Sequence, residues 1–253
     1  MYAEERQSAI LELARTHGRV DNAELAVRLD VAPETIRRDL STLERQGALR
    51  RVHGGAILAE RLGFEPAVAE RSLVRQEEKV RIARRAVEEL PEEGAILLDA
   101  GTTTAQVAEL LPAGRQLTVI TNSLSIGLAL AGRPSITVLS VGGRVRGRTF
   151  AAVDAWALRA LEQIFVDVAF VGTNGISAAR GLTTPDPAEA EVKGTMLRNA
   201  RRAIVLADHS KFERDHLTRF GDLADVELII SDDGLDRSIA DGVRACGPRV
   251  ELV

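Results

Sequence analysis

Apolar residues near the start of the chain recur with the period of an α-helix. Ile10, Leu11 and Leu13 predict a first helix that ends at Gly18. Asp21 predicts the start of a short second helix, because an aspartate ahead of an apolar helical run caps free N–H groups. The beginning of the chain is therefore expected to be helical.

A third helix is expected to open at Pro33 and to end at Gly47. Its apolar residues Ile36, Leu40 and Leu43 are spaced i, i+4, i+7 and predict one buried stripe. Two short helices joined by a tight break, the second with exposed arginines, are typical of a helix-turn-helix. Residues 48–56 then predict a short strand and a glycine turn, as in the wing of a winged helix.

From residue 76 onward the pattern alternates between amphipathic helices and apolar strands. Strands this apolar are buried on both faces, which favours a mostly parallel, Rossmann-like α/β sheet. The segment before it has mixed polarity and predicts a linker. The predicted strands are 95–100, 117–122, 136–143, 166–172, 203–208, 226–231 and 250–253. The expected organisation is a winged helix-turn-helix over 1–57, a linker over 58–75 and an α/β domain over 76–253.

Charge narrows the class of partner. The 253-residue chain has a net charge of −4, so any affinity for nucleic acid depends on where its charges lie. Between Arg37 and His53, five arginines face two acids, a local balance of +3. Phosphates favour such a patch. The basic charge is almost all arginine, and lysine occurs only at Lys79, Lys193 and Lys211.

Other classes are disfavoured by what the sequence lacks. The single cysteine, Cys246, allows neither an internal disulfide nor a cysteine-based metal site, and the histidines are scattered, so no metal is expected. No GxxxxGK[ST] motif is present and no GxGxxG follows a strand, so no nucleotide cofactor is expected. The start of the chain has no signal core, and no apolar run reaches the ~18 residues of a membrane span. We expect a soluble cytoplasmic protein.

Small, polar or glycine-rich loops follow five of the predicted strands. In parallel sheets these loops meet at one edge, where ligands bind. "DAGTTT", residues 99–104, would let backbone N–H groups approach a phosphate ahead of a helix N-terminus. Lys193, Lys211 or the arginines after Gly143 would supply positive charge, and Asp99, Asn122, Asn174 and Asp208 would bind sugar hydroxyls. The candidates are Asp99, Gly101, Thr102, Thr103, Thr104, Thr121, Asn122, Gly142, Gly143, Arg148, Asn174, Glu191, Lys193, Asp208 and Lys211.

The segment "TIRRDLSTLERQGALRRVHGGA" resembles the N-terminal signature of the DeoR family of bacterial transcription regulators. One departure is Ala32, where the family usually has a serine that would cap the third helix. The resemblance implies that Thr35, Arg37 and Arg38 face DNA, and that Arg51 and His53 of the wing contact phosphate or the minor groove.

The resemblance continues to about residue 232 through "DAGTTT", "TVITNS", "VGG", "DVAFVGTNGI", "GLTTPDPAEAEVK" and "LADHSKF". These follow, in order, the sensor-domain motifs of the same family. Such sensor domains are similar to ribose-5-phosphate isomerase and related sugar-phosphate enzymes. The resemblance therefore implies a DNA-binding regulator that senses a phosphorylated sugar.

The alternative is a sugar-phosphate isomerase or deaminase-like enzyme with a DNA-binding appendage. The isomerases have acids in a strand end where this chain reads "VGTNGI", with Val171, Asn174 and Gly175 in the places expected for acids. Without such groups general acid–base catalysis is lost. Glu191 could act as a base, but we expect it to orient Lys193 or a sugar hydroxyl. The regulator is therefore favoured, with no catalytic residue.

"GTNGI" and "GLTTPDPAEAEVK" are more similar to the fructose-operon branch of the family than to its glycerol-phosphate branch. This implies a repressor of a fructose or related sugar operon, released by a ketose phosphate such as fructose 1-phosphate. The partners implied are an operator in double-stranded DNA, the sugar phosphate and further copies of the chain. In a dimer or tetramer the effector would change the spacing of two DNA-binding domains.

Overall fold

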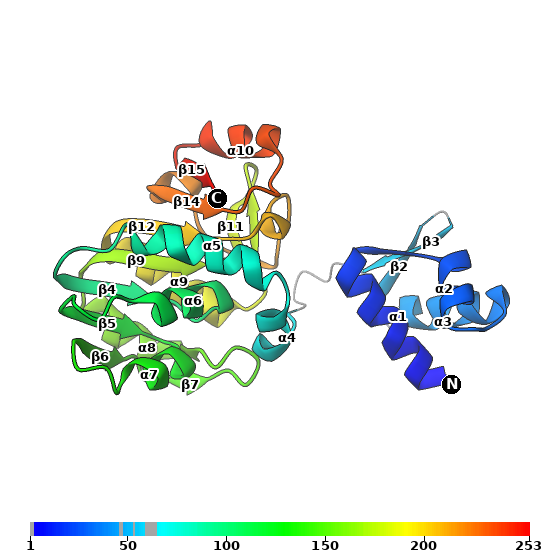
Figure 1. The fold of residues 1–253 in the computed structure, drawn as a ribbon, viewed down its shortest axis with the longest axis horizontal. Helices are drawn as coiled ribbons and strands as arrows, with labels where there is room; N and C mark the ends of the chain where they lie inside the picture. The colour runs from blue at the N-terminus through cyan, green and yellow to red at the C-terminus, as the bar shows by residue number, and fades with distance from the viewer. Residues whose placement is uncertain (1–2, 46–47, 53, 59–64) are drawn as a thin grey trace. The chain divides into compact units, whose positions relative to one another are not determined.

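The computed structural model describes residues 3–45, 48–52, 54–58 and 65–253. They belong to two compact units, Met1–Phe64 and Glu65–Val253, which are described separately (Figure 1). The second unit starts earlier than the sequence indicates. Residues 65–75, predicted as linker, belong to it and include helix α4 (Val68–Leu73). Part of the predicted linker is therefore a packed segment of the second unit.

The first unit has three helices and a small sheet. Strand β1 was not predicted, because three residues are too few to show a period of two. In the sheet both neighbouring pairs are antiparallel, in the order β1-β3-β2. The helices are α1 (Ala3–His17), α2 (Asn22–Arg28) and α3 (Pro33–Arg45), and the strands are β1 (Arg19–Asp21), β2 (Leu49–Val52) and β3 (Gly55–Leu58).

Local chemistry explains these elements. The Asp21 carboxylate accepts the backbone N–H groups of Ala23 and Glu24 and caps α2, as predicted. Pro33 is the first residue of α3. The apolar stripe of this helix, Ile36, Leu40 and Leu43, is buried in the core. Strand β3 requires a glycine where it begins beside β1, because a Cβ on Gly55 would lie 2.0 Å from the carbonyl oxygen of Val20.

The second unit is built on a seven-stranded parallel sheet, as the apolar pattern predicts (Figure 1). Its order is β15-β14-β12-β9-β4-β5-β6. The chain runs outward in one direction through β4, β5 and β6, and in the other through β9, β12, β14 and β15. The strands are β4 (Gly94–Leu98), β5 (Leu117–Thr121), β6 (Ile136–Ser140), β9 (Val166–Gly172), β12 (Ala200–Leu206), β14 (Leu228–Ser231) and β15 (Arg249–Leu252).

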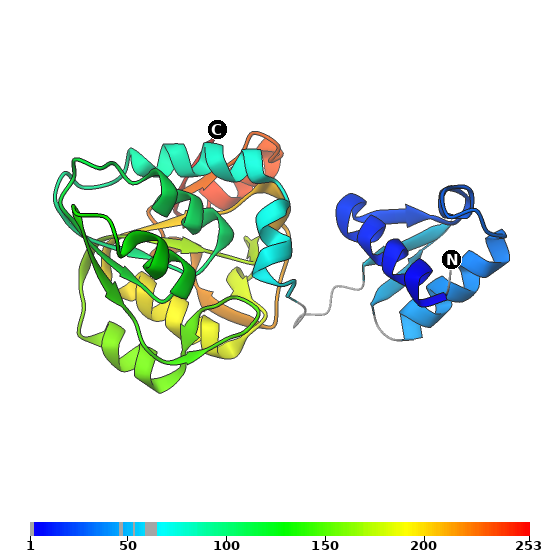
Figure 2. The same cartoon turned by 60° about the horizontal axis from the view of Figure 1, so that its bottom comes forward.

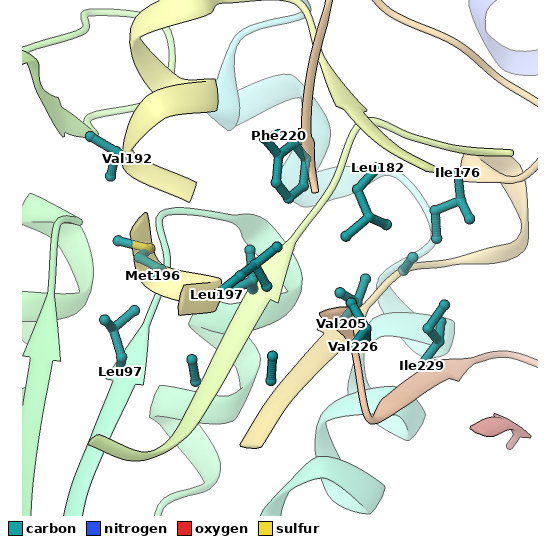
Figure 3. Packing of buried hydrophobic residues seen from close by; sticks show 14 of the residues in the cluster. Leu97, Ile176, Leu182, Val192, Met196, Leu197, Val205, Phe220, Val226 and Ile229 are labelled. Atoms are coloured by element: carbon teal, nitrogen blue, oxygen red, sulfur yellow. The ribbon is translucent and has the colours of Figure 1, made fainter. Parts of the chain in front are cut away.

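Helices cover both faces of this sheet, and Figure 2 shows the cyan helix α5 and the yellow helix α9 on opposite sides of it. In strand β4, Ile96 and Leu98 pack toward the first face, whereas Leu97 joins the core of the second (Figure 3). On the first face lie α5 (Gln76–Val87), α6 (Thr102–Leu110) and α7 (Leu124–Leu130). On the second lie α8 (Asp154–Glu162), α9 (Pro187–Arg198) and α10 (Arg237–Arg244).

The direction of the strand order reverses between β4 and β9. In open α/β sheets, ligands bind in the crevice at the carboxyl ends of the strands at such a reversal. Short elements that the sequence did not reveal lie in the connections beyond these ends. They are β7 (Arg144–Val145), β8 (Ala152–Val153), β10 (Gly175–Ser177), β11 (Gly181–Thr184), η1 (His209–Lys211), β13 (Thr218–Gly221) and η2 (Leu223–Asp225). In the part of the chain that the structure describes, no helix is both long and apolar enough to cross a bilayer.

Candidate functional sites: a basic helix and a polar sheet edge

Helix α3 presents a basic face. Arg37 and Arg38 are exposed, and Thr35 is half-buried beside them. Arg37 pairs with Glu34 at 3.1 Å, an exposed contact that holds its guanidinium only weakly. The face is hollowed, and the lining comes from Glu34, Arg37, Arg38, Ser41, Thr42, Arg45 and Arg51. Three of the predicted DNA-facing residues, Arg37, Arg38 and Arg51, thus share one accessible surface.

The wing is tied to this helix through Arg51. Its Nη1 donates to the Ser41 hydroxyl at 3.0 Å, and its backbone N–H donates to the Glu44 carboxylate at 3.0 Å. Strand β2 therefore brings Arg51 next to the helix that carries Arg37 and Arg38. His53, the other wing candidate, lies outside the described residues.

Asp39 has a different role from its neighbours in α3. It is 4% exposed and accepts hydrogen bonds from Arg6 Nε at 2.5 Å and from Gln7 Nε2 at 3.0 Å. One of the two acids counted against the basic segment is thus neutralised inside the unit. The exposed face of α3 is correspondingly more positive than the sequence count indicates.

At the reversal of the strand order in the second unit, Asp99 and Lys193 form a buried ion pair. Asp99 follows β4, and its carboxylate also accepts the backbone N–H of Gly172, at the end of β9, at 3.0 Å. The Lys193 ammonium donates to the Gly172 carbonyl at 3.0 Å as well. Burial raises the pKa of the Asp99 carboxyl, against the opposing effect of Lys193. The two predicted site residues meet at the carboxyl ends of β4 and β9.

The "DAGTTT" stretch turns from β4 into helix α6. Gly101 precedes the helix, and the next three residues form its first turn, where N–H groups have no partner within a helix. The Thr104 hydroxyl donates to the Asp99 carbonyl at 2.7 Å and is fully buried. Thr104 therefore shapes the turn. Thr102 is half-buried and Thr103 mostly buried at the same helix end.

Three further candidates have clear structural duties. Asn122 is buried and accepts the N–H of Ala100 at 2.9 Å, so it joins the loops after β4 and β5. The Thr121 hydroxyl accepts the N–H of Ser123 at 3.0 Å. A Cβ on Gly143, whose φ is +143°, would lie 2.4 Å from the Val153 carbonyl oxygen. Gly142 has open space around it.

Cationic side chains gather around Asp208, at the end of β12. Arg75 Nε lies 3.8 Å from the Asp208 carboxylate. The positive charge of Lys211 lowers the pKa of Asp208. The negative charge of Asp208 in turn opposes the lowering of the Lys79 pKa. The Lys79 ammonium is buried and donates to the carbonyl oxygens of Arg71 and Val74, the latter at 2.7 Å. The sequence singled out Lys79 only through the scarcity of lysine, and it singled out neither Arg71 nor Arg75.

The pKa values in this cluster reflect crowded positive charge. Burial lowers the pKa of Lys79 to about 8, although Asp208 opposes the shift. Burial also lowers the pKa of Lys211, and the nearby guanidinium of Arg71 adds to the effect. The pKa of Asp208 is lowered even though its burial opposes this, because Lys211, the Ser210 hydroxyl and Arg75 favour the carboxylate. The cluster carries more positive charge than Asp208 neutralises.

Asn174 and Arg148 reach the same edge from two other loops, and both contact Glu65. Asn174 donates to the Glu65 carboxylate at 3.3 Å and accepts from the Thr184 hydroxyl at 2.9 Å. Arg148 donates to the Glu65 carbonyl at 2.7 Å. The sequence placed Glu65 in the linker and did not identify it as part of the edge.

Of the two roles expected for Glu191, the orientation of Lys193 was wrong. Glu191 is exposed on α9, whereas Lys193 turns inward to Asp99. The buried acid of this helix is Glu189, which is 4% exposed and accepts from Arg146 and from Thr149. Residues 189 and 193 are one helical turn apart on the same face, and position 191 lies on the other side. That spacing is a signal in the sequence that would have selected Glu189.

Among the residues that the structure describes, no group of three His, Cys, Asp or Glu side chains is arranged to hold a metal ion. The chemistry at the edge is that of hydrogen-bond donors, carboxylates and cations.

Two family models match the chain. The DeoR-like helix-turn-helix domain matches residues 6–61, and the DeoR C terminal sensor domain matches residues 74–233. The chain belongs to the DeoR family. Both family domains are therefore present, and the DNA-binding domain comes first.

The DeoR relatives are similar over almost their whole length. The uncharacterized HTH-type transcriptional regulator FruR of Bacillus subtilis is 38% identical over 232 residues, covering 92% of each chain. The HTH-type transcriptional regulator GlpR of Haloferax volcanii is 35% identical and covers 99% of this chain and 98% of its own. The glycerol-3-phosphate regulon repressor of Escherichia coli is 32% identical and covers 90% of each.

Among solved structures, ribose 5-phosphate isomerase A of Methanocaldococcus jannaschii is similar, with 19% identity, a TM-score of 0.40 and 54% of each chain covered. As a DeoR family member the chain is a DNA-binding transcription regulator and not an enzyme. The alternative of a sugar-phosphate enzyme with a DNA-binding appendage is thereby set aside.

Proposed function

We propose that the first unit binds operator DNA with the exposed face of α3. Arg37 and Arg38 would reach base edges or phosphates in the major groove, with Thr35 beside them. Arg51, held against the same helix by Ser41, and His53 of the wing would contact the backbone or the minor groove. The neutralisation of Asp39 inside the unit supports this assignment, because it leaves the accessible face predominantly cationic.

We further propose that the second unit binds a phosphorylated sugar at the carboxyl edge of its sheet. The observation that carries this proposal is the cationic cluster of Lys79, Lys211, Arg71 and Arg75, whose charge exceeds that of Asp208. Lys79 is buried, and the positive charges of Lys211, Arg71 and Arg75 add to the lowering of its pKa, so an anionic ligand at this cluster would relieve their mutual repulsion. Phosphate would bind there and at the first turn of α6, beside Thr102 and Thr103.

The sugar would lie toward the crevice between β4 and β9. Asp99 and Asn174 offer carboxylate and amide groups for its hydroxyls, and Lys193 keeps Asp99 in place. The loop of Gly142, Gly143 and Arg148 would border the ligand. Asn122 and Thr121 would hold the loops after β4 and β5 in position. Glu191 has no place in this arrangement.

The identity of the sugar is proposed from motifs of the chain. "GTNGI" and "GLTTPDPAEAEVK" resemble the fructose-operon branch of the family, whereas the Escherichia coli relative is named for the glycerol-3-phosphate regulon. These motifs favour fructose 1-phosphate as the effector. We infer a repressor of a fructose or related operon, bound to DNA as a dimer or tetramer and released by the effector.

Two measurements test the function. A thermal-shift screen with fructose 1-phosphate, fructose 6-phosphate, glycerol 3-phosphate and unphosphorylated fructose should raise the melting temperature only with phosphorylated compounds, and most with fructose 1-phosphate. A mobility shift with DNA upstream of the chain's own operon should show a complex that the same compound dissociates. An equal response to fructose would exclude the phosphate site, and a complex tightened by the sugar phosphate would reverse the proposed sign.

A further inference from the structure

Glu65, the first residue of the second unit, places an acidic side chain inside the polar edge. It is only 3% exposed. One carboxylate oxygen lies 2.9 Å from Arg146 Nη1, and the other accepts from Asn174 at 3.3 Å and lies 3.5 Å from Arg71 Nη1. These three donors come from the β7 hairpin, the β9–β10 turn and helix α4. A single carboxylate thus joins three segments of the edge.

The backbone around Glu65 is fastened at the same place. Arg148 donates from its guanidinium to the Glu65 carbonyl at 2.7 Å, and the Arg148 carbonyl accepts the N–H of Val68 at 2.7 Å. Helix α4, which follows, has no buried side chain, and Leu73 at its end is 80% exposed. Polar contacts at the edge, rather than apolar packing, therefore hold residues 65–73 on the second unit.

Arg71 is shared between Glu65 and the cationic cluster. Its Nη1 faces Glu65, while its Nε and Nη2 are buried without a hydrogen-bond partner in the part of the chain that the structure describes. A guanidinium with two such N–H groups is suited to grip an oxyanion in a bidentate manner. The positive charge of this guanidinium also adds to the lowering of the Lys211 pKa.

We propose that Glu65 and the anionic effector compete for Arg71, Arg146 and Asn174, so that effector binding releases residues 65–73 from the edge. This inference rests on the proposed function of the second unit. Since residues 65–73 are the part of the second unit nearest in sequence to the DNA-binding unit, their release is a route by which a small anion alters DNA binding.

The competition has a physical basis. A phosphate group carries close to two negative charges at neutral pH, against one on Glu65, and both require the same guanidinium groups. Two negative charges held at a shared site repel each other. The effector phosphate therefore weakens the docking of the Glu65 carboxylate by the same free energy by which Glu65 weakens the binding of the effector. Once Glu65 leaves, α4 keeps the hydrogen bonds from the Lys79 ammonium to the Arg71 and Val74 carbonyls. The C-terminal end of α4 would then act as the hinge.

The first test measures affinity with the full chain. Glu65→Gln removes the competing charge but keeps the side-chain shape, and Glu70→Gln removes one charge from the exposed side of α4 as a matched control. By isothermal titration with fructose 1-phosphate, Glu65→Gln should bind roughly tenfold more tightly, and Glu70→Gln should match the wild type. Unchanged or weaker binding by Glu65→Gln would overturn the proposal.

The second test separates this proposal from the proposed function. Hydrogen exchange of the amides in residues 67–73 should be faster in Glu65→Gln than in the wild type with no ligand added. In the wild type, 50 mM inorganic phosphate should accelerate the same amides, a result that requires no variant to fold. If no sugar phosphate binds, the proposed function fails while these rates still decide the role of Glu65. Slower exchange with phosphate, or wild-type rates in the variant, would refute it.

Discussion

The two units of this regulator hold their positive charge in opposite ways. In the first, Arg37 and Arg38 lie exposed on α3, and the buried charges, Arg6 and Asp39, neutralise each other. In the second, the cations are inside: Lys79 and Lys193 are 5% and 4% exposed. Both units have positive charge suited to phosphates. The arginines of the first unit are hydrated, whereas the two lysines of the second unit are buried away from water.

This difference matches the two kinds of phosphate ligand. Exposed arginines bind a long polyanion by releasing its counterions, so the affinity depends steeply on salt and extends over a broad surface. A buried ammonium has lost its hydration before the ligand arrives, so it gains more from one small anion that fits. The comparison predicts that salt mainly affects the first unit and pH mainly affects the second.

The largest expected effect is on the buried pair of the first unit. Asp39→Ala removes the buried carboxylate that accepts hydrogen bonds from Arg6 and Gln7, which should destabilise that unit by about 3–5 kcal/mol. Because each unit has its own core, differential scanning calorimetry should show an early transition for the first unit and an unchanged one for the second. A uniform shift of both transitions would contradict the independence of the two cores.

The corresponding change in the second unit should have a pH-dependent effect. Lys193→Met removes the partner of Asp99, whose carboxyl pKa burial already raises. Below the folded pKa the carboxyl takes up a proton and the loss of stability is small. As pH rises from the unfolded pKa of about 3.9 through the folded value, the unpaired charge destabilises the unit progressively. Urea unfolding should therefore show a larger deficit at pH 8 than at pH 5, and an equal deficit would contradict the assignment.

A smaller effect is expected on DNA binding. Arg37→Ala should weaken operator binding by about 10- to 100-fold, the equivalent of roughly 1–3 kcal/mol for one base-reading contact. Fluorescence anisotropy with labelled operator measures it. Lys211→Ala is the matched control, since it removes a cation from the second unit and should leave the free protein's operator affinity unchanged. A weaker complex with Lys211→Ala would mean that the second unit also touches DNA.

The smallest effect is the pH dependence of effector binding. The pKa of Lys79 is lowered to about 8, so the ammonium is charged at pH 7 and mostly neutral at pH 9. A phosphate ester has its second pKa near 6 and does not titrate in this range. Affinity for fructose 1-phosphate should therefore fall several-fold from pH 7 to pH 9. Lys79→Arg should make this fall smaller, and Lys211, whose pKa is also lowered, accounts for the rest. A flat wild-type profile would remove Lys79 from the phosphate site.

The fold was largely predictable because burial leaves a direct pattern. The parallel strands are apolar on both faces, so β4, β5, β9 and β12 appear as continuous apolar runs. Strands β10, β11 and β13 escaped prediction, since their stability comes from pairing with one another rather than from any period of their own. Helix α4 escaped because it buries no side chain.

The site was predictable only in part. The loops at the strand ends could be found from topology, but the pairing of Asp99 with Lys193 joins residues 94 positions apart, and no local pattern encodes it. Glu65 lay in a stretch of mixed polarity, and only its three-dimensional partners give it a function. Glu189 could have been preferred over Glu191 by helical phase, had the buried face of α9 been known.

All three lysines of the chain belong to the second unit, and two of them are almost completely buried. Amine-directed chemistry therefore has no side-chain target in the DNA-binding unit. Dyes, cross-linkers and resins that couple through amines would leave the surface of α3 unmodified, and a lysine-specific protease would find two of its three sites, Lys79 and Lys193, shielded in the native chain. Loss of that resistance would report the opening of the second unit without any label on the DNA-binding face.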